Sequence, residues 1–467
     1  MEFPYRTYLI LFLVLSLSTL PALSYTVFSP VDNYLVDCGS DDDSTVDNRR
    51  FVGEESSNSG SLVSHSDGSI PVRNNNSFVN SSPIYDTARV FTRPSKYEFE
   101  IRDKGTHMVR LHFQTLNSSK FDFFNAQFHV LVNDHVVLSN FSGGNIVIPR
   151  VNDYLIWVSS EKLVITFIPA KPSKFAFVNA IEVISAPKDL VPNTAQLVTS
   201  EKIVNFDGLE KQALEVVYRV NVAGPKVTQF NDTLWRTWVP DNEYLESSFG
   251  SKSLYFGGRI KYQKGGASRE VCPDNVYNTA RVIQSTNDSI PNVNITWTFP
   301  VVGGYKYLVR MHFCDIASIS IGLLYFNVYV NGNLAYKDLD MSSVTNYMLA
   351  SPFYADFVVD GDDLSVLTVS VGPSNKSLAH TIVGILNGVE IMKMNNSMGS
   401  LDGMVCADWV SRSWPRGNVG VLFPLVFAVC LLLGISMVVQ RKLIWNEGYS
   451  FGWSKLPVDV SETSVKH

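Results

Sequence analysis

The chain has 467 residues, of which 18% are charged, and its formal net charge is −6 at pH 7. About 400 residues lie between two apolar segments, which is too many for one ordinary core and suits two domains of roughly 170 to 190 residues. No basic cluster accompanies the modest acidity, so nothing in the composition indicates a nucleic-acid partner.

The first apolar segment predicts a secretory signal at residues 1–24. Arg6 precedes an apolar run from Tyr8 to Leu20, and Ala22 and Ser24 are the small residues that signal peptidase accepts at −3 and −1. An uncleaved anchor is the alternative, but about 13 apolar residues fall short of the roughly 20 needed to cross a bilayer.

The second apolar segment, residues 419–439, predicts a single transmembrane helix. It contains no charge, and Arg441 and Lys442 follow it directly, as expected where a stop-transfer helix meets the cytoplasm. A buried core helix is the alternative, which so long a charge-free run disfavours. We therefore expect a single-pass type I protein with a short cytoplasmic tail, residues 440–467.

Sequons of the form Asn-x-Ser/Thr occur only between the two apolar segments. Any one of them is weak evidence, but their density behind a signal segment predicts a glycosylated, water-facing ectodomain. The asparagines are Asn75, Asn80, Asn117, Asn140, Asn231, Asn287, Asn294, Asn375 and Asn395.

Five cysteines are present, and Cys430 falls in the predicted span. Cys38, Cys272, Cys314 and Cys406 are expected in an oxidising compartment, where disulfides persist. Four cysteines permit three pairings, and all three stay open. So few possible bridges mean that hydrophobic cores hold the fold together.

The region between the apolar segments repeats itself in the same order. The offset between partners drifts from 192 to 208 residues, which is typical of small loop insertions in a duplicated domain. The matched stretches are 85–90 with 277–282, 110–113 with 310–313, 130–133 with 328–331, and 178–183 with 386–391.

Within each copy the patterns predict β-strands. Residues 108–113 alternate, residues 163–168 are nearly all β-formers, and Asn331-Gly332 is a strong hairpin signal because both residues tolerate a positive φ. These features predict an all-β fold with two tandem β-sandwiches.

The expected boundaries follow from composition. We place domain 1 at 25–190, a linker at 191–214, domain 2 at 215–394 and a juxtamembrane stalk at 395–418. The stalk is rich in Gly, Ser and Asn and is expected to be flexible.

An ordered set of motifs resembles a known family, the malectin-like receptor kinases of plants, also called the FERONIA-like family. Besides the repeated stretches, the motifs are Asp-Cys-Gly-Ser at 37–40, Tyr-Arg-Val-Asn-Val-Ala-Gly at 218–224, Trp-Val-Pro-Asp-Asn-Glu-Tyr at 238–244 and Asn-Gly-Val-Glu-Ile-Met-Lys-Met at 387–394. The resemblance covers about residues 30 to 440.

The resemblance implies tandem malectin-like, jelly-roll-like domains on a plasma-membrane protein. Such domains would sense cell-wall carbohydrate or a secreted peptide of the rapid alkalinization factor type, with a GPI-anchored LORELEI-like co-receptor. We therefore expect a peptide or a wall polysaccharide as the ligand.

The family's usual output is an intracellular kinase, and residues 440–467 contain none of its motifs. The Gly-rich loop, the catalytic Lys on a strand, His-Arg-Asp and Asp-Phe-Gly are all missing. We therefore expect no enzyme here, but a co-receptor or decoy for a full-length receptor kinase, or the product of a truncated gene model. A membrane-anchored scaffolding partner of such a kinase is the alternative from another class.

Two histidines, His112 and His312, occupy equivalent positions in the two copies. A repeated position usually serves the fold, so structural hydrogen bonding is favoured over a ligand or a general base. The same reasoning favours salt bridges inside the sandwich for the repeated arginines, Arg89, Arg281, Arg110 and Arg310.

Aromatic faces are what a carbohydrate site would use, since they stack on sugar C–H groups. The candidates are Tyr85, Phe121, Phe123 and Phe124 in the first copy and Tyr277 in the second, with core packing as the competing role for each.

Catalytic and metal patterns are missing from the sequence. The acidic loop at 41–47 lacks the Gly and the distant Glu of an EF-hand, so a solvated loop is favoured over a calcium site. Zinc motifs and a nucleophile elbow are absent, and no spacing identifies the paired carboxylates of a wall-polysaccharide hydrolase. We expect no catalytic residue, no metal and no cofactor, with the hydrolase as the least favoured alternative.

Overall fold

The structure is a computed structural model that describes residues 28–55, 69–75, 82–144, 146, 148–285, 289–361, 365–414 and 419–447. The chain forms two compact units, one ending at Trp414 and one beginning at Pro415. The predicted signal segment, residues 1–24, and residues 448–467 of the predicted tail lie outside the described residues.

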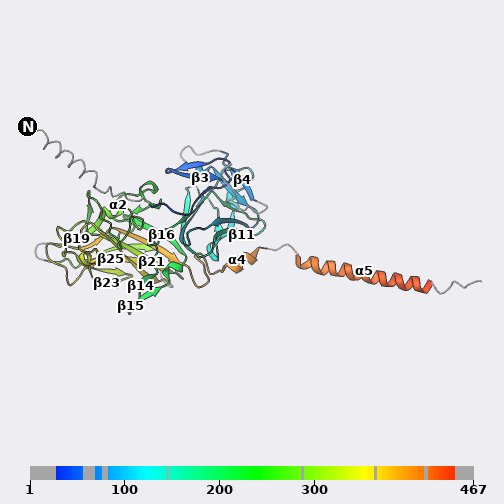
Figure 1. Ribbon diagram of the computed structural model, residues 1–467. Coiled ribbons are helices and arrows are strands. Elements are labelled where there is room, and N and C mark those ends of the chain that lie inside the picture. The colour runs from blue at the N-terminus through cyan, green and yellow to red at the C-terminus, as the bar shows by residue number, and fades with distance from the viewer. Residues whose placement is uncertain are drawn as a thin grey trace, which may run out of the picture. The chain divides into compact units, whose positions relative to one another are not determined.

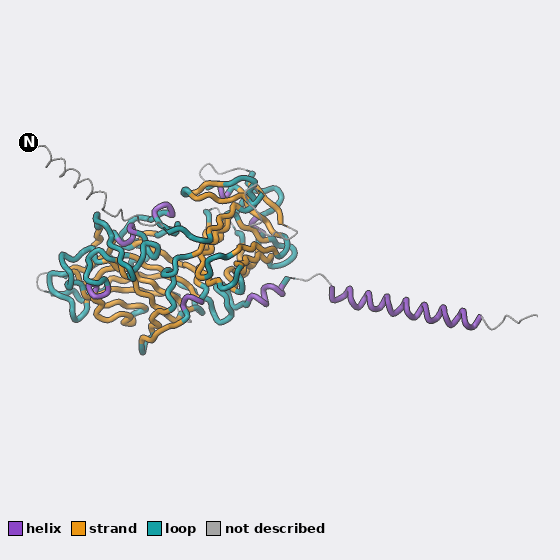
Figure 2. Tube along the Cα trace, in the orientation of Figure 1, coloured by secondary structure: helices purple, strands orange, loops and turns teal. Residues whose placement is uncertain are grey.

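The first unit is mostly β-strand, as the sequence predicts (Figure 2). Its described α-helices are single turns or little more: α2 (Asp274–Tyr277), α3 (Met341–Val344) and α4 (Ala407–Ser413). The 3₁₀ turns are η1 (Pro83–Tyr85), η2 (Phe123–Asn125), η3 (Leu209–Lys211) and η4 (Gln229–Asn231).

One sheet of 13 strands runs through the whole first unit. Its strands, in order across the sheet, are β15 (Ile203–Asp207), β14 (Thr194–Val198), β24 (Pro352–Asp360), β21 (Lys306–Cys314), β27 (Gly388–Met394), β16 (Leu214–Asn221), β10 (Arg150–Val158), β7 (Gly105–Phe113), β13 (Ala180–Ser185), β1 (Asn33–Asp37), β3 (Arg49–Gly53) and β2 (Ser44–Val46), with β17 (Val239–Pro240) paired to β16.

The half of this sheet from β10 to β2 covers a first hydrophobic core, and we call this part the first lobe. Alternate residues of β7, namely Val109, Leu111 and Phe113, face the core, whereas Arg110 and His112 point to the other side of the sheet. The other sheets of this lobe are β6 (Ser95–Glu100), β11 (Lys162–Pro169), β8 (Gln127–Val132) and β9 (His135–Ser142), and β12 (Ala176–Val178), β5 (Thr87–Phe91) and β4 (Ser69–Arg73).

The half from β16 to β24 covers a second core, and we call this part the second lobe; its strands are green to orange in Figure 1. In β21, Val309 and Met311 face this core, and Arg310 and His312 point away from it. Its other sheets are β20 (Ile295–Pro300), β25 (Val366–Pro373), β22 (Tyr325–Val330) and β23 (Asn333–Asp340), and β18 (Lys252–Tyr255), β19 (Thr279–Gln284) and β26 (Ile382–Leu386).

The hairpin predicted at Asn331-Gly332 is confirmed. These residues connect β22 to β23, and their φ angles are +50° and +73°. A two-residue turn with both φ angles positive matches the twist of the strands that it joins.

The two lobes share backbone hydrogen bonds and a third core. β10 pairs with β16 at Tyr154 with Glu215 and at Leu155 with Leu214. Because of this continuous sheet, the division into two malectin-like domains at 25–190 and 215–394 stays a prediction. The third buried cluster takes side chains from both lobes, among them Met108, Leu155, Ile184, Leu214, Leu308 and Met392.

The segment expected as a linker, residues 191–214, is built into the sheet. β14 and β15 form a hairpin, and β14 pairs in parallel with β24 of the second lobe. Ala195 and Leu209 are buried in the third cluster. The linker prediction missed this because a polar edge hairpin has no long apolar alternation in its sequence.

The stalk expected to be flexible differs from the structure over residues 395–414, which fold back on the first lobe. Leu401 is buried in the first core, and the amide of Val136 donates to the carbonyl of Gly399. Val410 of α4 is buried against a small cluster that includes Leu131. The few apolar residues in a Gly- and Ser-rich stretch are therefore enough to dock it.

The second unit contains α5 (Val419–Glu447), which includes the predicted span 419–439. Its stretch Val426–Leu443 is long and apolar enough to cross a membrane, with a mean hydropathy of 1.8. Among the described residues this is the one helix that passes that test, which agrees with the expected single-pass topology.

Candidate functional site

A row of alternating charges crosses the shared sheet from one lobe to the other, on the face opposite the two main cores. Seven consecutive strands contribute one residue each, and neighbours in the row have opposite charges. In strand order the residues are Glu182 (β13), Arg110 (β7), Asp153 (β10), Arg219 (β16), Glu390 (β27), Arg310 (β21) and Asp356 (β24).

The central part of this charge row is a chain of ion pairs that joins the lobes. Arg110 lies 3.0 Å from Glu182 and 3.4 Å from Asp153. The same Asp153 oxygen lies 3.2 Å from Arg219 of the second lobe, which lies 2.8 Å from Glu390. All five side chains are at least 88% buried, so each charge depends on its neighbours for compensation.

In the first lobe the charge row ends in a Tyr-His-Glu chain. The Tyr85 hydroxyl lies 2.9 Å from His112 Nδ1, and His112 Nε2 lies 3.0 Å from Glu182 Oε1. Burial alone would raise the pKa of Glu182, but Arg110 and His112 outweigh it and hold the pKa well below its usual range.

The second lobe repeats this chain. The Tyr277 hydroxyl lies 3.2 Å from His312 Nδ1, and His312 Nε2 lies 3.2 Å from Glu390 Oε2. Burial lowers the pKa of His312. For Glu390, burial works towards a higher pKa, and the hydrogen bond with His312 and the charge of Arg219 outweigh it to lower the pKa. Both histidines thus make the structural hydrogen bonds that the sequence favours.

A groove of about 300 Å³ opens where β10 and β16 diverge. Asp153 lies on one side of it, and Arg236, Trp235, Tyr218 and Tyr244 lie on the other. Asp153 Oδ1 and Arg236 Nη2 are buried and have no hydrogen-bond partner among the described residues. An acceptor and a donor left open in one groove are suited to a ligand group, or a water, that both donates and accepts.

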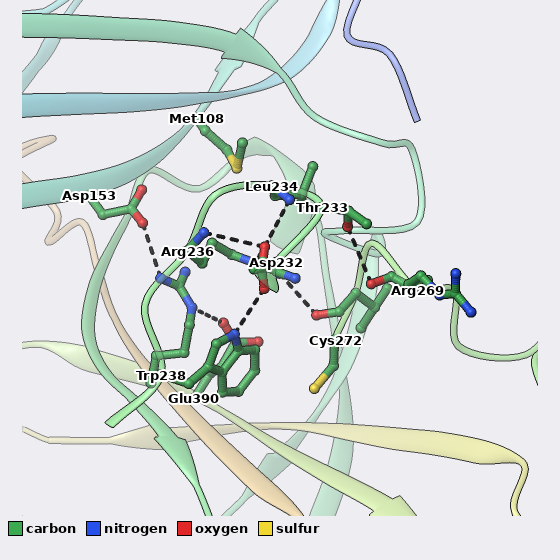
Figure 3. A network of polar contacts seen from close by, with 12 residues as sticks. Met108, Asp153, Asp232, Thr233, Leu234, Arg236, Trp238, Arg269, Cys272 and Glu390 are labelled. Carbon is green, nitrogen blue, oxygen red and sulfur yellow. Dashed lines mark hydrogen bonds and ion pairs between the residues drawn. The ribbon is translucent and has the colours of Figure 1, made fainter. Parts of the chain in front are cut away.

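Asp232 holds the second wall of the groove in place (Figure 3). Its carboxylate accepts from the backbone of Leu234, from Nε of Arg236 and from Nε1 of Trp238. Trp235, between them, has a φ of +53°, and the guanidinium of Arg49 lies 5.1 Å from the centre of its ring. A bulky residue in the left-handed region is uncommon and is kept there by its surroundings.

The groove residues were not among the sequence candidates. Asp153 and Arg219 are charged residues in strands that also contain several apolar residues, and a charge in such a place is the signal that could have identified them. Asp232 and Arg236 lie in a loop that no pattern distinguishes from other polar loops.

The aromatic candidates divide into buried and exposed residues. Tyr85, Phe123 and Tyr277 are buried, and Phe121 is partly buried against the first core. Phe124 is 61% exposed and is therefore the candidate whose ring is accessible to a ligand. The structure does not bring the five rings together: Tyr277 belongs to the second lobe and the others to the first.

The predicted sequons lie largely on the surface. Asn75, Asn117, Asn140, Asn231, Asn294 and Asn375 are exposed, and Asn80 and Asn287 lie outside the described residues. Asn395 is half-buried, and its Oδ1 accepts a hydrogen bond from the amide of Ala213 at 2.8 Å. Glycosylation would take place at Nδ2 of Asn395, which donates to the carbonyl of Asn396 at 3.3 Å, so the contact of Oδ1 with Ala213 can be kept.

The four cysteines considered for disulfides are free thiols in the structure. Cys38, Cys272 and Cys314 are buried, and Cys406 is half-buried. Cys38 packs in the first core and the other two buried thiols in a cluster of the second lobe, so Cys38 is separated from them. The possible pairing of these cysteines stays a prediction.

The acidic loop considered for calcium is partly used for internal contacts. Asp43 pairs with Arg50 and accepts from the amide of Gly53. Among the described residues, no three His, Cys, Asp or Glu side chains are grouped as metal ligands.

Comparisons with known proteins agree with this geometry. Residues 36–394 match the model of the malectin-like domain. THESEUS 1, a receptor-like protein kinase of Arabidopsis thaliana, is 39% identical over 386 residues, which are 82% of this chain and 44% of that protein. The chain spans about half the length of the curated receptor-like kinases that it matches.

Solved structures show the same fold. The extracellular domain of ANXUR1 from Arabidopsis thaliana has a TM-score of 0.70 and 27% identity, over 80% of this chain and 99% of that one. A structure of the plant peptide RALF23 with FER and LLG2 has a TM-score of 0.68 and 30% identity, over 81% of this chain and 99% of that one. The resemblance found in the sequence is confirmed: this chain belongs to the malectin-like family, together with the ectodomains of plant receptor-like kinases.

Proposed function

We propose that this chain is a cell-surface receptor-like protein whose ectodomain binds a secreted peptide of the rapid alkalinization factor type. The observation that supports this most is the likeness to the FER ectodomain, which was solved with RALF23 and LLG2. A GPI-anchored LORELEI-like protein is the co-receptor that the same likeness suggests.

The joint between the lobes supports binding by a preformed surface. The shared sheet, the third core and the charge row all cross it. A surface that is already ordered loses less conformational entropy on binding than one that must be assembled. We therefore expect recognition without a large rearrangement of the two lobes.

The membrane placement is part of the proposal. With α5 as the span, the first unit faces the cell exterior and the protein lies in the plasma membrane. We assign transmission of the signal to a full-length receptor kinase, for which this chain acts as a co-receptor or a decoy.

Binding is tested with the full chain in lipid nanodiscs. A synthetic RALF-type peptide is titrated with and without a purified LLG2-type protein, and unfolding is followed by heat. Specific binding at 100 times Kd stabilises the folded state by about 2.7 kcal/mol. No stabilisation in either condition would refute the proposal, and stabilisation by oligogalacturonides alone would replace the peptide with wall carbohydrate.

The partner role is tested by co-expression with a full-length kinase of the THESEUS 1 type. Both roles predict that this chain competes for, or shares, the peptide. A co-receptor increases kinase output at low peptide concentration, whereas a decoy lowers it. Unchanged output over the whole titration contradicts both.

A further inference from the structure

One half of strand β24 has an open edge. On one side, β24 pairs with β21 along its whole length. On the other side, β14 pairs only with residues 357–359. Within the described chain, no strand is paired with residues 352–356 on that side. An unpaired strand edge presents backbone donors and acceptors that another chain can pair with.

This open edge lines a cleft of about 700 Å³ in the second lobe. Residues 352–356 all line it, and Thr194 and Gln196 of β14 form part of the opposite wall. Loop residues 265–267 close one end. The cleft therefore lies along the part of β24 that has no paired strand on this side.

The polar groups of the cleft favour a ligand with donors and a positive charge. Gln196 Oε1 is buried without a hydrogen-bond partner among the described residues. Asp189 is exposed on the rim of the cleft and makes no ion pair with another described residue. The carboxylate of Asp356, in contrast, lies 2.7 Å from Nε of Arg310. One carboxylate thus stays uncompensated, and the half-buried rings of Tyr336 and Phe353 add apolar surface.

The edge of β10 in the first lobe is equivalent to the open edge of β24, and it shows which groups can lie beside such an edge. There β10 pairs with β16 at residues 154–155 and then diverges from it. The chain itself takes up part of that space: Leu234 O, in a turn, accepts from Arg110, and β17 pairs with the other end of β16, while the groove of about 300 Å³ stays open. In the second lobe Leu190 O accepts from Arg310 in the same way, yet no described strand is paired with residues 352–356 on the outer side of β24.

We propose that an extended peptide with a lysine or arginine side chain binds in this cleft as an added strand along residues 352–356. Pairing with the backbone would supply affinity, and contacts with Asp189 and Gln196 would supply selectivity. The inference rests on the proposed peptide-binding function and names a site for it. A sugar cannot use the regular spacing of a strand edge, so a peptide is favoured over a saccharide.

The probe is a phage-displayed library of random heptapeptides, selected on the full chain in nanodiscs. Selected sequences are synthesised, and hydrogen–deuterium exchange locates their binding. We expect enrichment of lysine or arginine and protection of the amides of residues 353–356. Thr194→Trp, which fills the mouth of the cleft, should weaken binding about tenfold or more, and Asp189→Asn about threefold.

Matched controls lie on the same hairpin outside the cleft. Lys202→Trp and Asp207→Asn introduce the same side chains at exposed positions and should leave peptide affinity unchanged. If the selected peptides protect other amides and their affinity is unchanged by Thr194→Trp, the cleft is refuted as the binding site. The proposed peptide-binding function is retained in that case.

Three further outcomes also count against the proposed peptide site. If no heptapeptide is selected while the RALF-type peptide binds, the proposed binding site is refuted and the proposed function is retained. If neither peptide binds, both proposals are refuted. Protection of residues 353–356 by oligogalacturonides would make the cleft a saccharide site instead.

Discussion

Strands β10 and β24 occupy the same place in the two lobes, and they differ in what lies beside them. Asp153 pairs with Arg110 on the neighbouring strand, and Asp356 pairs with Arg310. Beyond β10 lies the other lobe, with a groove of about 300 Å³. Beyond β24 lies only a hairpin, with a cleft of about 700 Å³. The strand and its ion pair are thus alike in the two lobes, while the outer edge of the strand has two different neighbours.

A second contrast concerns a buried polar position at the end of a strand. In the first lobe Thr87 donates to the carboxylate of Asp37 at 2.9 Å, and in the second lobe Thr279 donates to the amide of Asn221 at 2.7 Å. The threonine donates in both lobes, but only in the first lobe is the acceptor at this position a titratable group. Equivalent geometry therefore does not imply equivalent response to pH.

The largest expected effect tests whether the two glutamates of the charge row that contact a histidine are equivalent. Glu182→Ala removes the carboxylate that pairs with Arg49 and Arg110, and Glu390→Ala removes the one that pairs with Arg219; each should destabilise the protein by about 3 to 5 kcal/mol. Urea unfolding of the full chain in nanodiscs measures the loss. Glu98→Ala, which removes only an exposed pair with Lys162, is the control and should change little. A small loss of stability in either Glu182→Ala or Glu390→Ala would show that the two glutamates are not equivalent.

The contrast between Asp37 and Asn221 should appear as pH dependence. Burial raises the pKa of Asp37 from 3.8 to about 6. Its folded-state pKa lies above the unfolded value, so its stabilising contribution is complete below pH 3.8 and is lost as the pH rises through 6. The rise corresponds to about 3 kcal/mol at most.

Asp37→Asn should remove this slope between pH 4 and 7 in urea unfolding experiments, because the second lobe has the amide at this position already. Asn221→Asp is the reciprocal variant and should introduce a slope of the same sign. An unchanged slope in the first variant would show that Asp37 is not the group that titrates.

A smaller effect concerns residues 395–414, whose buried side chains Leu401 and Val410 pack on the first lobe. Val410→Ala removes buried methyl groups facing Leu131 and Ile168, at a loss of about 1 to 2 kcal/mol. The amides of α4 should then exchange faster with deuterium, and those of the second lobe should not. Equal exchange in wild type and variant would mean that Val410 does not hold the segment.

The smallest effect compares the two tyrosines. Tyr85→Phe and Tyr277→Phe each remove a hydroxyl that lies next to a buried histidine, and each should lose about 1 kcal/mol. Melting temperatures measure both, with the exposed Tyr255 changed to Phe as the control. Clearly unequal losses would show that the two Tyr-His-Glu chains are not equivalent in energy.

Much of the fold could be predicted because its signals are local. The alternation of β7, the turn at Asn331 and Gly332, and the repeated stretches all depend on residues close in the sequence. The candidate site residues could not be predicted in the same way, because their exposure depends on the tertiary structure. Phe123 and Phe124 are neighbours with the same side chain, yet one is buried and the other is 61% exposed.

The sequence by itself determined the mostly-β fold, the duplication, the apolar helix and the family, because periodicity, motif order and composition are properties of the chain alone. Only the tertiary structure decided that residues 191–214 complete a sheet, that residues 395–414 dock on the first lobe, and that the edge of β24 stays open. The reason is physical: these outcomes depend on contacts such as that of Arg310 with Leu190, 120 residues apart, whose partners no local pattern identifies.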